Sequence, residues 1–290
     1  MTTIPTRRAR RRRFDAIEVL LRAWGAGVYL FLYVPIAIVV LYSFNDSRFV
    51  LAWGGFSVRW YASAWTDPQV LGTLRTSLAV AALNTLFATT LGTVAALAIA
   101  RAPRPLRAAF DALVFTALIV PEVVIALASL LFLNGAFGFL RDLGIRVGFG
   151  IPTIVAGHVL WNLSLVILVV RARMAGLDRS LIEASADLFA TPWRTFTGVT
   201  LPQLAPAVLA GALLSFTFSM DDVVLSTFLS GVGSTTLPMR VFSMIRFGVT
   251  PAVNAISTVM LAVTITMILV AQWLVRRTGR HPAVAEDAAG

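Results

Sequence analysis

The feature that most constrains this chain is a series of six apolar runs, each long enough to cross the hydrocarbon core of a membrane. Such a crossing takes about 20 helical residues at ~1.5 Å per residue. None of the runs has the two-residue alternation of a membrane β-strand, so helices must satisfy the backbone in lipid. The runs lie near residues 24–44, 76–100, 111–133, 152–170, 203–229 and 252–275. The sequence therefore predicts an all-α integral membrane protein with six transmembrane helices.

The composition agrees with a membrane protein and excludes several kinds of site. The chain is 58% hydrophobic and 13% charged, whereas charged residues make up about a quarter of a typical soluble domain. There is no cysteine, so disulfides and thiolate metal ligands are excluded. Neither GxSxG nor HExxH occurs, and no catalytic residue is predicted. His158 has no second histidine or cysteine at a ligand spacing, which favours an interior polar group over a metal ligand.

Arginine supplies all 24 of the basic side chains, because the chain has no lysine. A phosphate-binding GxxxxGK[ST] loop needs that lysine, so this chain cannot contain one. The arginines also orient the predicted helices. They concentrate in both tails and in the second and fourth connections, at residues 7–22, 101–107, 171–194 and 276–280. By the positive-inside rule, both termini and the connection at 171–202 are cytoplasmic.

These features divide the chain into three parts. Residues 1–23 form an arginine-rich cytoplasmic tail, residues 24–275 form the transmembrane domain, and residues 276–290 form a second cytoplasmic tail. The run "RRARRRRF" admits binding to nucleic acid or acidic lipid, but the apolar run that follows favours a topology determinant. That first apolar run is too long for a signal peptide and is followed by "NDSRF" rather than a cleavage site, so we expect it to remain as an anchor.

The cytoplasmic connection contains the stretch "EASADLFATPWRTFTGVTLP", residues 183–202. Ser180 and Glu183 have the spacing of a capping box, which predicts the start of a short helix. Thr191 before a proline predicts the start of a second helix, and the Leu-Pro pair at 201–202 predicts its end. Two short capped helices at the membrane surface are either a docking element or a linker that lies at the interface.

This stretch resembles the EAA loop of ABC importer permeases, which couples the permease to its ATPase subunit and spans residues 173–202 here. The family pattern is E-A-A, a glycine six residues after the glutamate, and an ending such as Leu-Pro. Phe189 stands where the family has glycine. A phenylalanine in a left-handed turn costs about 1 kcal/mol, so either the turn is built differently or Phe189 fills a pocket on the partner. The resemblance implies ATPase-coupling positions at Glu183, Ala184, Phe189, Ala190, Leu201 and Pro202.

The resemblance extends over most of the chain. The segments "LSFTFSMDDVVLSTFLSG", "LPMRVFSMIRFGVTPAVNAIST", "SFNDSRF" and "RWY" resemble the second permease subunit of spermidine/putrescine importers. This implies a type I ABC importer permease fold, alternating-access import of polyamines and a multi-pass protein of the bacterial cytoplasmic (inner) membrane. It also implies a second permease subunit, a pair of ATPase subunits that bind ATP and Mg²⁺, and an extracytoplasmic polyamine-binding protein. No cofactor and no nucleic acid partner is then expected for this chain itself.

Three carboxylates lie inside the predicted spans, where acidic side chains are costly and usually face an aqueous path. Glu122 would lie about 16 Å into the third run, near the middle of the membrane. Asp221 and Asp222 lie deep in the fifth run, and adjacent helical residues point about 100° apart, so both cannot face one lumen squarely. Three acids without an arginine in the same spans suit a polycation. The alternative is a protonated carboxyl that hydrogen-bonds a neighbouring helix.

Trp60, in the external "RWY", either offers a cation-π face to an ammonium group or anchors the chain at the membrane interface. The resemblance implies that Trp60, Glu122, Asp221 and Asp222 belong to the polyamine path. Two other functions stay open. An ion-coupled symporter also buries acids but normally has an internal repeat, and none is found in the sequence. A permease of the same family for ferric ion or an anion is the nearer alternative, although an anion calls for arginine in the spans.

Overall fold

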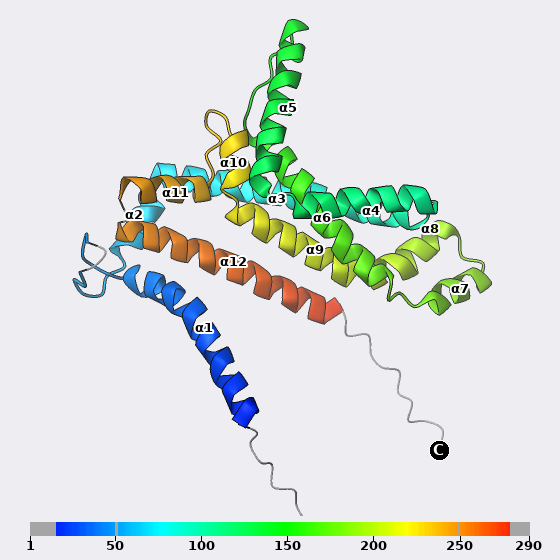
Figure 1. The fold of residues 1–290 in the computed structure, drawn as a ribbon, viewed down its shortest axis with the longest axis horizontal. Coiled ribbons are helices and arrows are strands. Elements are labelled where there is room, and N and C mark those ends of the chain that lie inside the picture. The colour runs from blue at the N-terminus through cyan, green and yellow to red at the C-terminus, as the bar shows by residue number, and fades with distance from the viewer. Residues whose placement is uncertain (1–15, 50–51, 249, 279–290) are drawn as a thin grey trace, which may run out of the picture.

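The computed structural model describes residues 16–49, 52–248 and 250–278, and its regular structure is helical apart from an isolated β-bridge between Asn45 and Phe56 (Figure 1). Most of both predicted tails therefore lies outside the described residues. In chain order the helices are α1 (Ala16–Tyr42), α2 (Arg59–Thr66), α3 (Pro68–Ala100), α4 (Arg104–Ile119), α5 (Glu122–Asp142), α6 (Ile151–Met174), α7 (Arg179–Asp187), α8 (Pro192–Thr195), the π-helix η1 (Phe196–Thr200), α9 (Leu201–Asp221), α10 (Val224–Leu229), α11 (Leu237–Phe247) and α12 (Pro251–Thr278).

Six helical segments of the described chain are long and apolar enough to span a membrane, as the sequence predicts. They are Glu18–Tyr42, Pro68–Ala100, Glu122–Asp142, Ile151–Met174, Pro192–Asp221 and Pro251–Val270. The all-α, six-helix prediction is confirmed. Two of the predicted apolar runs, the third and the fifth, are nevertheless interrupted, and these interruptions shape the candidate site.

The centre of the fold is the packing of α3, α6 and α9, three helices that contact one another along much of their length (Figure 1). Small residues allow this close approach: a Cβ added at Gly92 of α3 would lie 2.7 Å from Val166 Cγ1 of α6. Helices in lipid associate through such packing and through interhelical hydrogen bonds, because lipid removes the hydrophobic drive between them. Asn84 supplies one such bond, donating from α3 to the Ser215 carbonyl of α9 at 2.9 Å.

The third apolar run breaks into two helices. α4 ends at Ile119, Val120 and Pro121 are extended with ψ of 130° and 136°, and α5 begins at Glu122. A proline disfavours the helical conformation in the residue before it, which ends α4 at this point. The apolar run at residues 111–133 is therefore divided between two helices. Glu122 therefore lies at the first residue of a helix rather than in the middle of one.

The fifth run is broken as well. α9 ends at Asp221, Asp222 is extended with ψ of 128°, and the short α10 follows from Val224. The Asp222 carboxylate, one residue before the N-cap, accepts a hydrogen bond from the Ser226 backbone N–H at 2.8 Å and so satisfies one free donor in the first turn of α10. The prediction of one helix over residues 203–229 is corrected. The expected 100° between the two aspartates does not apply, because Asp222 is outside the helix.

The connection predicted to be cytoplasmic differs from its predicted structure at two points. The N-cap of α7 is Asp178, whose carboxylate accepts from Ser180 N–H, so the predicted capping box at Ser180 is wrong. Thr191 caps α8 as predicted, with its side chain accepting from the Arg194 N–H. The chain then continues through the π-turn of η1 directly into α9, so residues 201–202 do not end the helix. The π-turn widens the helix just before Pro202, where the proline ring would otherwise clash with the carbonyl four residues back.

The two ends of the fold carry different short helices, and two long helices stand apart from its body. In Figure 1, α7 and α8 lie at one end, whereas α2 and α11 lie at the other. α5 projects away from the packed helices, and α1 contacts mainly α12. Large apolar side chains of both helices are exposed, among them Phe31 and Phe132.

Candidate functional site

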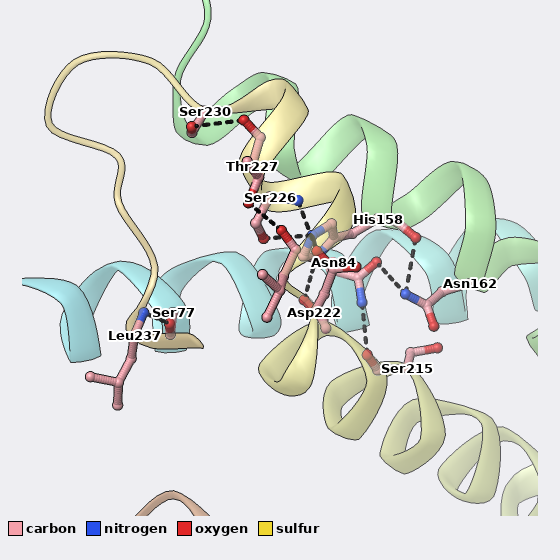
Figure 2. A network of polar contacts seen from close by, with 12 residues as sticks. Ser77, Asn84, His158, Asn162, Ser215, Asp222, Ser226, Thr227, Ser230 and Leu237 are labelled. Atoms are coloured by element: carbon pink, nitrogen blue, oxygen red, sulfur yellow. Dashed lines mark hydrogen bonds and ion pairs between the residues drawn. The ribbon is translucent and has the colours of Figure 1, made fainter. Parts of the chain in front are cut away.

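Where the two broken helices meet, a buried network of polar side chains surrounds His158 (Figure 2). His158 lies on α6 with 1% of its side chain exposed, and its Nδ1 shares a hydrogen bond of 2.7 Å with the Ser219 hydroxyl. Its Nε2 lies 3.2 Å from both the Asp222 carboxylate and the Ser226 hydroxyl. An Nε2–H directed at Asp222 leaves Nδ1 to accept from Ser219, so a neutral imidazole satisfies both contacts. His158 is thus a hydrogen-bonded interior group, as its sequence context favours.

The network extends from His158 toward α3. Asn162, one helical turn after His158, donates to the His158 carbonyl at 3.0 Å and to the Asn84 side-chain oxygen at 3.4 Å. Asn84 in turn donates to the carbonyl of Ser215. These contacts join α3, α6, α9 and α10 near the C-terminal end of α9 (Figure 2). Buried polar groups need such partners, since an unpaired one costs about 1–3 kcal/mol.

Glu122 joins this cluster from the first turn of α5. Its side chain lines the same cavity as Asp222, whose carboxylate is held by His158 and Ser226. The packing of α5 on α10 brings the two carboxyls together. The two helix interruptions thus bring Glu122 and Asp222, from distant parts of the sequence, to one cavity with His158.

A cavity of about 400 Å³ opens beside the three carboxylates. It is lined by Glu122, His158, Trp161, Asn162, Phe218, Ser219, Asp221, Asp222, Val223, Val224 and Leu225. A volume of this size lies within the range of ligand pockets, about 300–1,000 Å³. Among these described lining residues there is no arginine, so the acids face the cavity without a permanent counter-charge.

Asp221 also faces a second cavity of about 400 Å³, which α9, α11 and α12 enclose. The second cavity is mainly apolar, with Met220, Met260 and Leu261 in its wall. Asp221 and Val223 line both cavities and separate the acidic space from the apolar one.

The structure brings three of the four sequence-predicted pathway residues together and leaves the fourth elsewhere. Glu122, Asp221 and Asp222 share the acidic cavity. Trp60 lies on α2, where its indole N–H donates to the Asn45 carbonyl at 2.9 Å and the Arg59 guanidinium lies 4.6 Å from its ring centre. A role for Trp60 in the path stays a prediction.

Sequence reasoning did not select Trp161 or Phe218, the aromatic residues of the acidic cavity. Trp161 follows His158 by three residues, a spacing that puts two helical side chains on neighbouring parts of one face. This spacing could have identified Trp161 as a neighbour of His158 from the sequence. Phe218 lies three residues before Asp221 on α9, so the same spacing relates these two side chains. This spacing points to the cavity only once α9 is known to end at Asp221.

The coupling positions predicted from the sequence are mostly exposed. Phe189 has a φ of 56° and is 95% exposed. Its N–H bonds the Ala186 carbonyl at 2.9 Å, and the Ala190 N–H bonds the Ser185 carbonyl at 3.1 Å, the two hydrogen bonds of a Schellman motif. Phe189 therefore adopts the left-handed turn itself. Its ring is exposed, as are the side chains of Leu188 and Trp193 in the same connection.

The other coupling positions divide between exposed and half-buried sites. Glu183, Ala184, Leu201 and Pro202 are exposed, and Ala190 is half-buried. Behind the loop, a cavity of about 520 Å³ separates Ala190 from the end of α3. The Ser185 and Thr195 hydroxyls share a hydrogen bond of 2.5 Å that ties α7 to α8.

The N-terminus of α7 carries a stabilised carboxylate. Ser180 donates its hydroxyl at 2.7 Å and its backbone N–H at 2.9 Å to Asp178. These hydrogen bonds favour the ionised form and hold the pKa of the Asp178 carboxyl below its ordinary value. The cap is therefore in place at neutral pH.

The known proteins that this chain resembles are membrane components of transport systems. The family model of the binding-protein-dependent transport system inner membrane component matches residues 88–280. The putrescine transport system permease protein PotI of Escherichia coli (strain K12) is 40% identical over 257 residues, which cover 87% of this chain and 89% of that protein. The spermidine/putrescine transport system permease protein PotC of the same strain is 36% identical over 249 residues, covering 86% of this chain and 91% of that protein.

A solved structure shares the fold over nearly the whole chain. It is the bacterial alginate ABC transporter in complex with an alginate pentasaccharide-bound periplasmic protein. One of its chains superimposes with a TM-score of 0.75 at 17% sequence identity, covering 92% of this chain and 96% of that one.

Proposed function

Because this chain belongs to the family of binding-protein-dependent transport system inner membrane components, we propose that it is a permease subunit of an ATP-driven importer of polyamines. Its relatives are transporter permeases, two of them named for putrescine or spermidine. The observation that carries the substrate is the acidic cavity, where Glu122, Asp221 and Asp222 meet at two helix breaks. Such intramembrane acids attract cations, and linear polyamines carry several positive charges.

The partners follow from the same family. The chain pairs with a homologous second permease, and the exposed faces of α1 and α5 are the surfaces available for that partner and for lipid. A pair of ATPase subunits binds ATP and Mg²⁺, and this chain binds no cofactor. An extracytoplasmic binding protein delivers the polyamine, and one structural relative is a transporter solved with its periplasmic protein.

The coupling surface transmits ATPase movement to the acidic cavity. ATP binding closes the ATPase pair, and α7 moves with it through Glu183 and the apolar cluster of Leu188, Phe189 and Trp193. The Ser185–Thr195 hydrogen bond passes this movement to α8, which continues through η1 into α9. α9 ends at Asp221, so one continuous helical path joins the coupling loop to the wall of the cavity. The cavity then opens alternately to the outside and, after hydrolysis, to the cytoplasm.

The decisive experiment is uptake of radiolabelled putrescine and spermidine into proteoliposomes. They hold this chain, its partner permease and the ATPase, with the binding protein outside and ATP inside. We expect uptake to require every component and to be lost in Glu122→Gln. The complex with Glu183→Ala should hydrolyse ATP but import no polyamine, because this substitution uncouples the ATPase from the permease.

Two results would contradict the proposal. ATPase stimulation by a binding protein loaded with another solute, without amine uptake, would keep the family and overturn the substrate. Uptake driven by an ion gradient in the absence of the ATPase would instead establish a secondary transporter. Normal uptake in Glu183→Ala would remove only the coupling assignment.

A further inference from the structure

Two aromatic side chains line the acidic cavity together with its carboxylates. Trp161 of α6 and Phe218 of α9 both line it, with ring centroids 5.1 Å apart and planes inclined by 68°. In this edge-to-face arrangement the edge of one ring packs against the face of the other. Half-buried Trp161 also packs on the core cluster around Ile154, which holds the indole in place.

The carboxylates of the cavity are held in different ways. Asp222 is fixed, because its carboxylate already accepts from Ser226 N–H and contacts His158. Asp221 is exposed, and within the described part of the chain no hydrogen bond or ion pair engages its carboxylate. Glu122 is half-buried and lines the same cavity. The cavity therefore offers a free negative charge beside a rigid aromatic surface.

We propose that Trp161 is the aromatic wall of a binding site for one primary ammonium group, with Asp221 and Glu122 as its counter-charges. This inference rests on the proposed function and specifies how the substrate is held. A cation within about 6 Å of an indole ring centre is attracted by the negative face of the ring, most strongly where water is excluded. The Asp222–His158 pair keeps its position when the ligand binds, and it positions Glu122.

The second cavity extends this site. Asp221 and Val223 line both spaces, so a ligand whose ammonium lies beside Trp161 passes Asp221 as it enters the apolar cavity. Met220, Met260 and Leu261 there suit a methylene chain, since flexible apolar side chains adapt to an alkyl ligand. The ligand class is a linear polyamine, with one terminal primary ammonium beside Trp161 and its methylene chain along the second cavity.

The test uses graded fluorination of the Trp161 ring in the complete reconstituted complex. Tryptophan is replaced at position 161 by its mono-, di- and tetrafluoro analogues, which nearly keep the shape of the ring but withdraw charge from its face. The first readout is retention of labelled putrescine by complexes with ATP bound to a hydrolysis-defective ATPase. The second is ATPase stimulation by the loaded binding protein in otherwise normal complexes.

We expect retention to fall stepwise along the series, by on the order of tenfold at the tetrafluoro ring, because a desolvated cation-π contact has that strength. ATPase stimulation should stay unchanged. Retention that stays flat across the series would overturn the assignment of Trp161. A purely structural role for the ring predicts that flat result, since its shape is kept.

Matched variants complete the design. The same fluorination at Trp65, on α2 and outside the acidic cavity, should change neither readout. Trp161→Phe should retain putrescine better than Trp161→Leu, because it keeps an aromatic face. If the unmodified complex imports amines and the series is flat, this inference fails alone. If the unmodified complex imports no amine at all, the proposed function fails.

Discussion

At the residue scale, a carboxylate with 6% of its side chain exposed needs partners, and Asp222 finds them in the Ser226 N–H and His158. Removing one member of a buried charged pair typically costs about 3–5 kcal/mol. A side chain of the same shape that still accepts these hydrogen bonds avoids most of that cost. Asp222 thus allows its charge to be tested apart from its structural role.

We predict that Asp222→Asn lowers polyamine uptake at least about tenfold, roughly 1.4 kcal/mol, while ATPase stimulation by the loaded binding protein changes much less. The amide oxygen still accepts from Ser226, so the helix break persists, but the cavity loses one negative charge. The measurement is labelled putrescine uptake beside ATP hydrolysis in the same proteoliposomes. Asp222→Ala is the control for structural damage. An unchanged uptake rate in Asp222→Asn would leave Asp222 with a hydrogen-bonding role only.

Phe189 provides a second test at this scale. Phe189→Gly should relieve about 1 kcal/mol of left-handed backbone strain and still weaken coupling, because the exposed ring is lost. The quantities to compare are the thermal stability of the purified chain and the uptake per ATP of the complex. Phe189→Asn, which also tolerates this turn, is the matched control and should couple equally poorly. Wild-type coupling in both variants would show that the ring makes no functional contact.

At the element scale, the short α10 depends on its close packing against α6. Gly157 of α6 has no room for a side chain, since an added Cβ would lie 2.2 Å from Leu229 Cδ1. Leu229 is fully buried, and Thr153 donates to its carbonyl at 2.7 Å. Forcing extra volume into a packed core costs about 1–3 kcal/mol.

We therefore predict that Gly157→Ala lowers the thermal stability of the detergent-solubilised chain and that Leu229→Ala in the same chain partly restores it. The second substitution removes the atom that the new Cβ meets. Gly198→Ala, where an added Cβ meets nothing within 4 Å, is the control for helix propensity alone. Equal stability of Gly157→Ala and Gly198→Ala would contradict this packing.

At the scale of the whole molecule, the opposite placement of α7–α8 and of α2–α11 gives the chain two functional ends (Figure 1). The arginine distribution predicts that the α7–α8 end is cytoplasmic. Because the chain has no cysteine, a single introduced cysteine is its only thiol, and labelling of that thiol shows on which side of the membrane the position lies. Leu188 and Val232 suit this use, at 82% and 107% exposed on opposite ends.

In membranes without the ATPase, we predict that a membrane-impermeant maleimide labels Val232→Cys, but not Leu188→Cys, in right-side-out vesicles. Inverted vesicles should give the reverse pattern. A permeant maleimide should label both variants and serves as the control. Labelling of Leu188→Cys from the outside would overturn the predicted orientation and with it the coupling role of α7.

The features of this protein that depend on local composition could be predicted from its amino-acid sequence. Six apolar runs specify six spanning helices, because hydropathy summed over about 20 residues decides whether a helix is stable in lipid. The Thr191 cap and the identity of the three acids of the cavity were also readable in this way. Phe189 was visible as an unusual residue, although its left-handed φ was not.

The meeting of the acids depends on packing between segments that are distant in sequence. A hydropathy window averages over one or two extended residues, so it joined α4 to α5 and α9 to α10 and hid both breaks. Those breaks bring Glu122, His158 and Asp222 together from distant parts of the chain, and they admit Trp161 and Phe218 to the same cavity. Interhelical hydrogen bonds and close packing stabilise this arrangement, and both arise between segments that no local pattern relates.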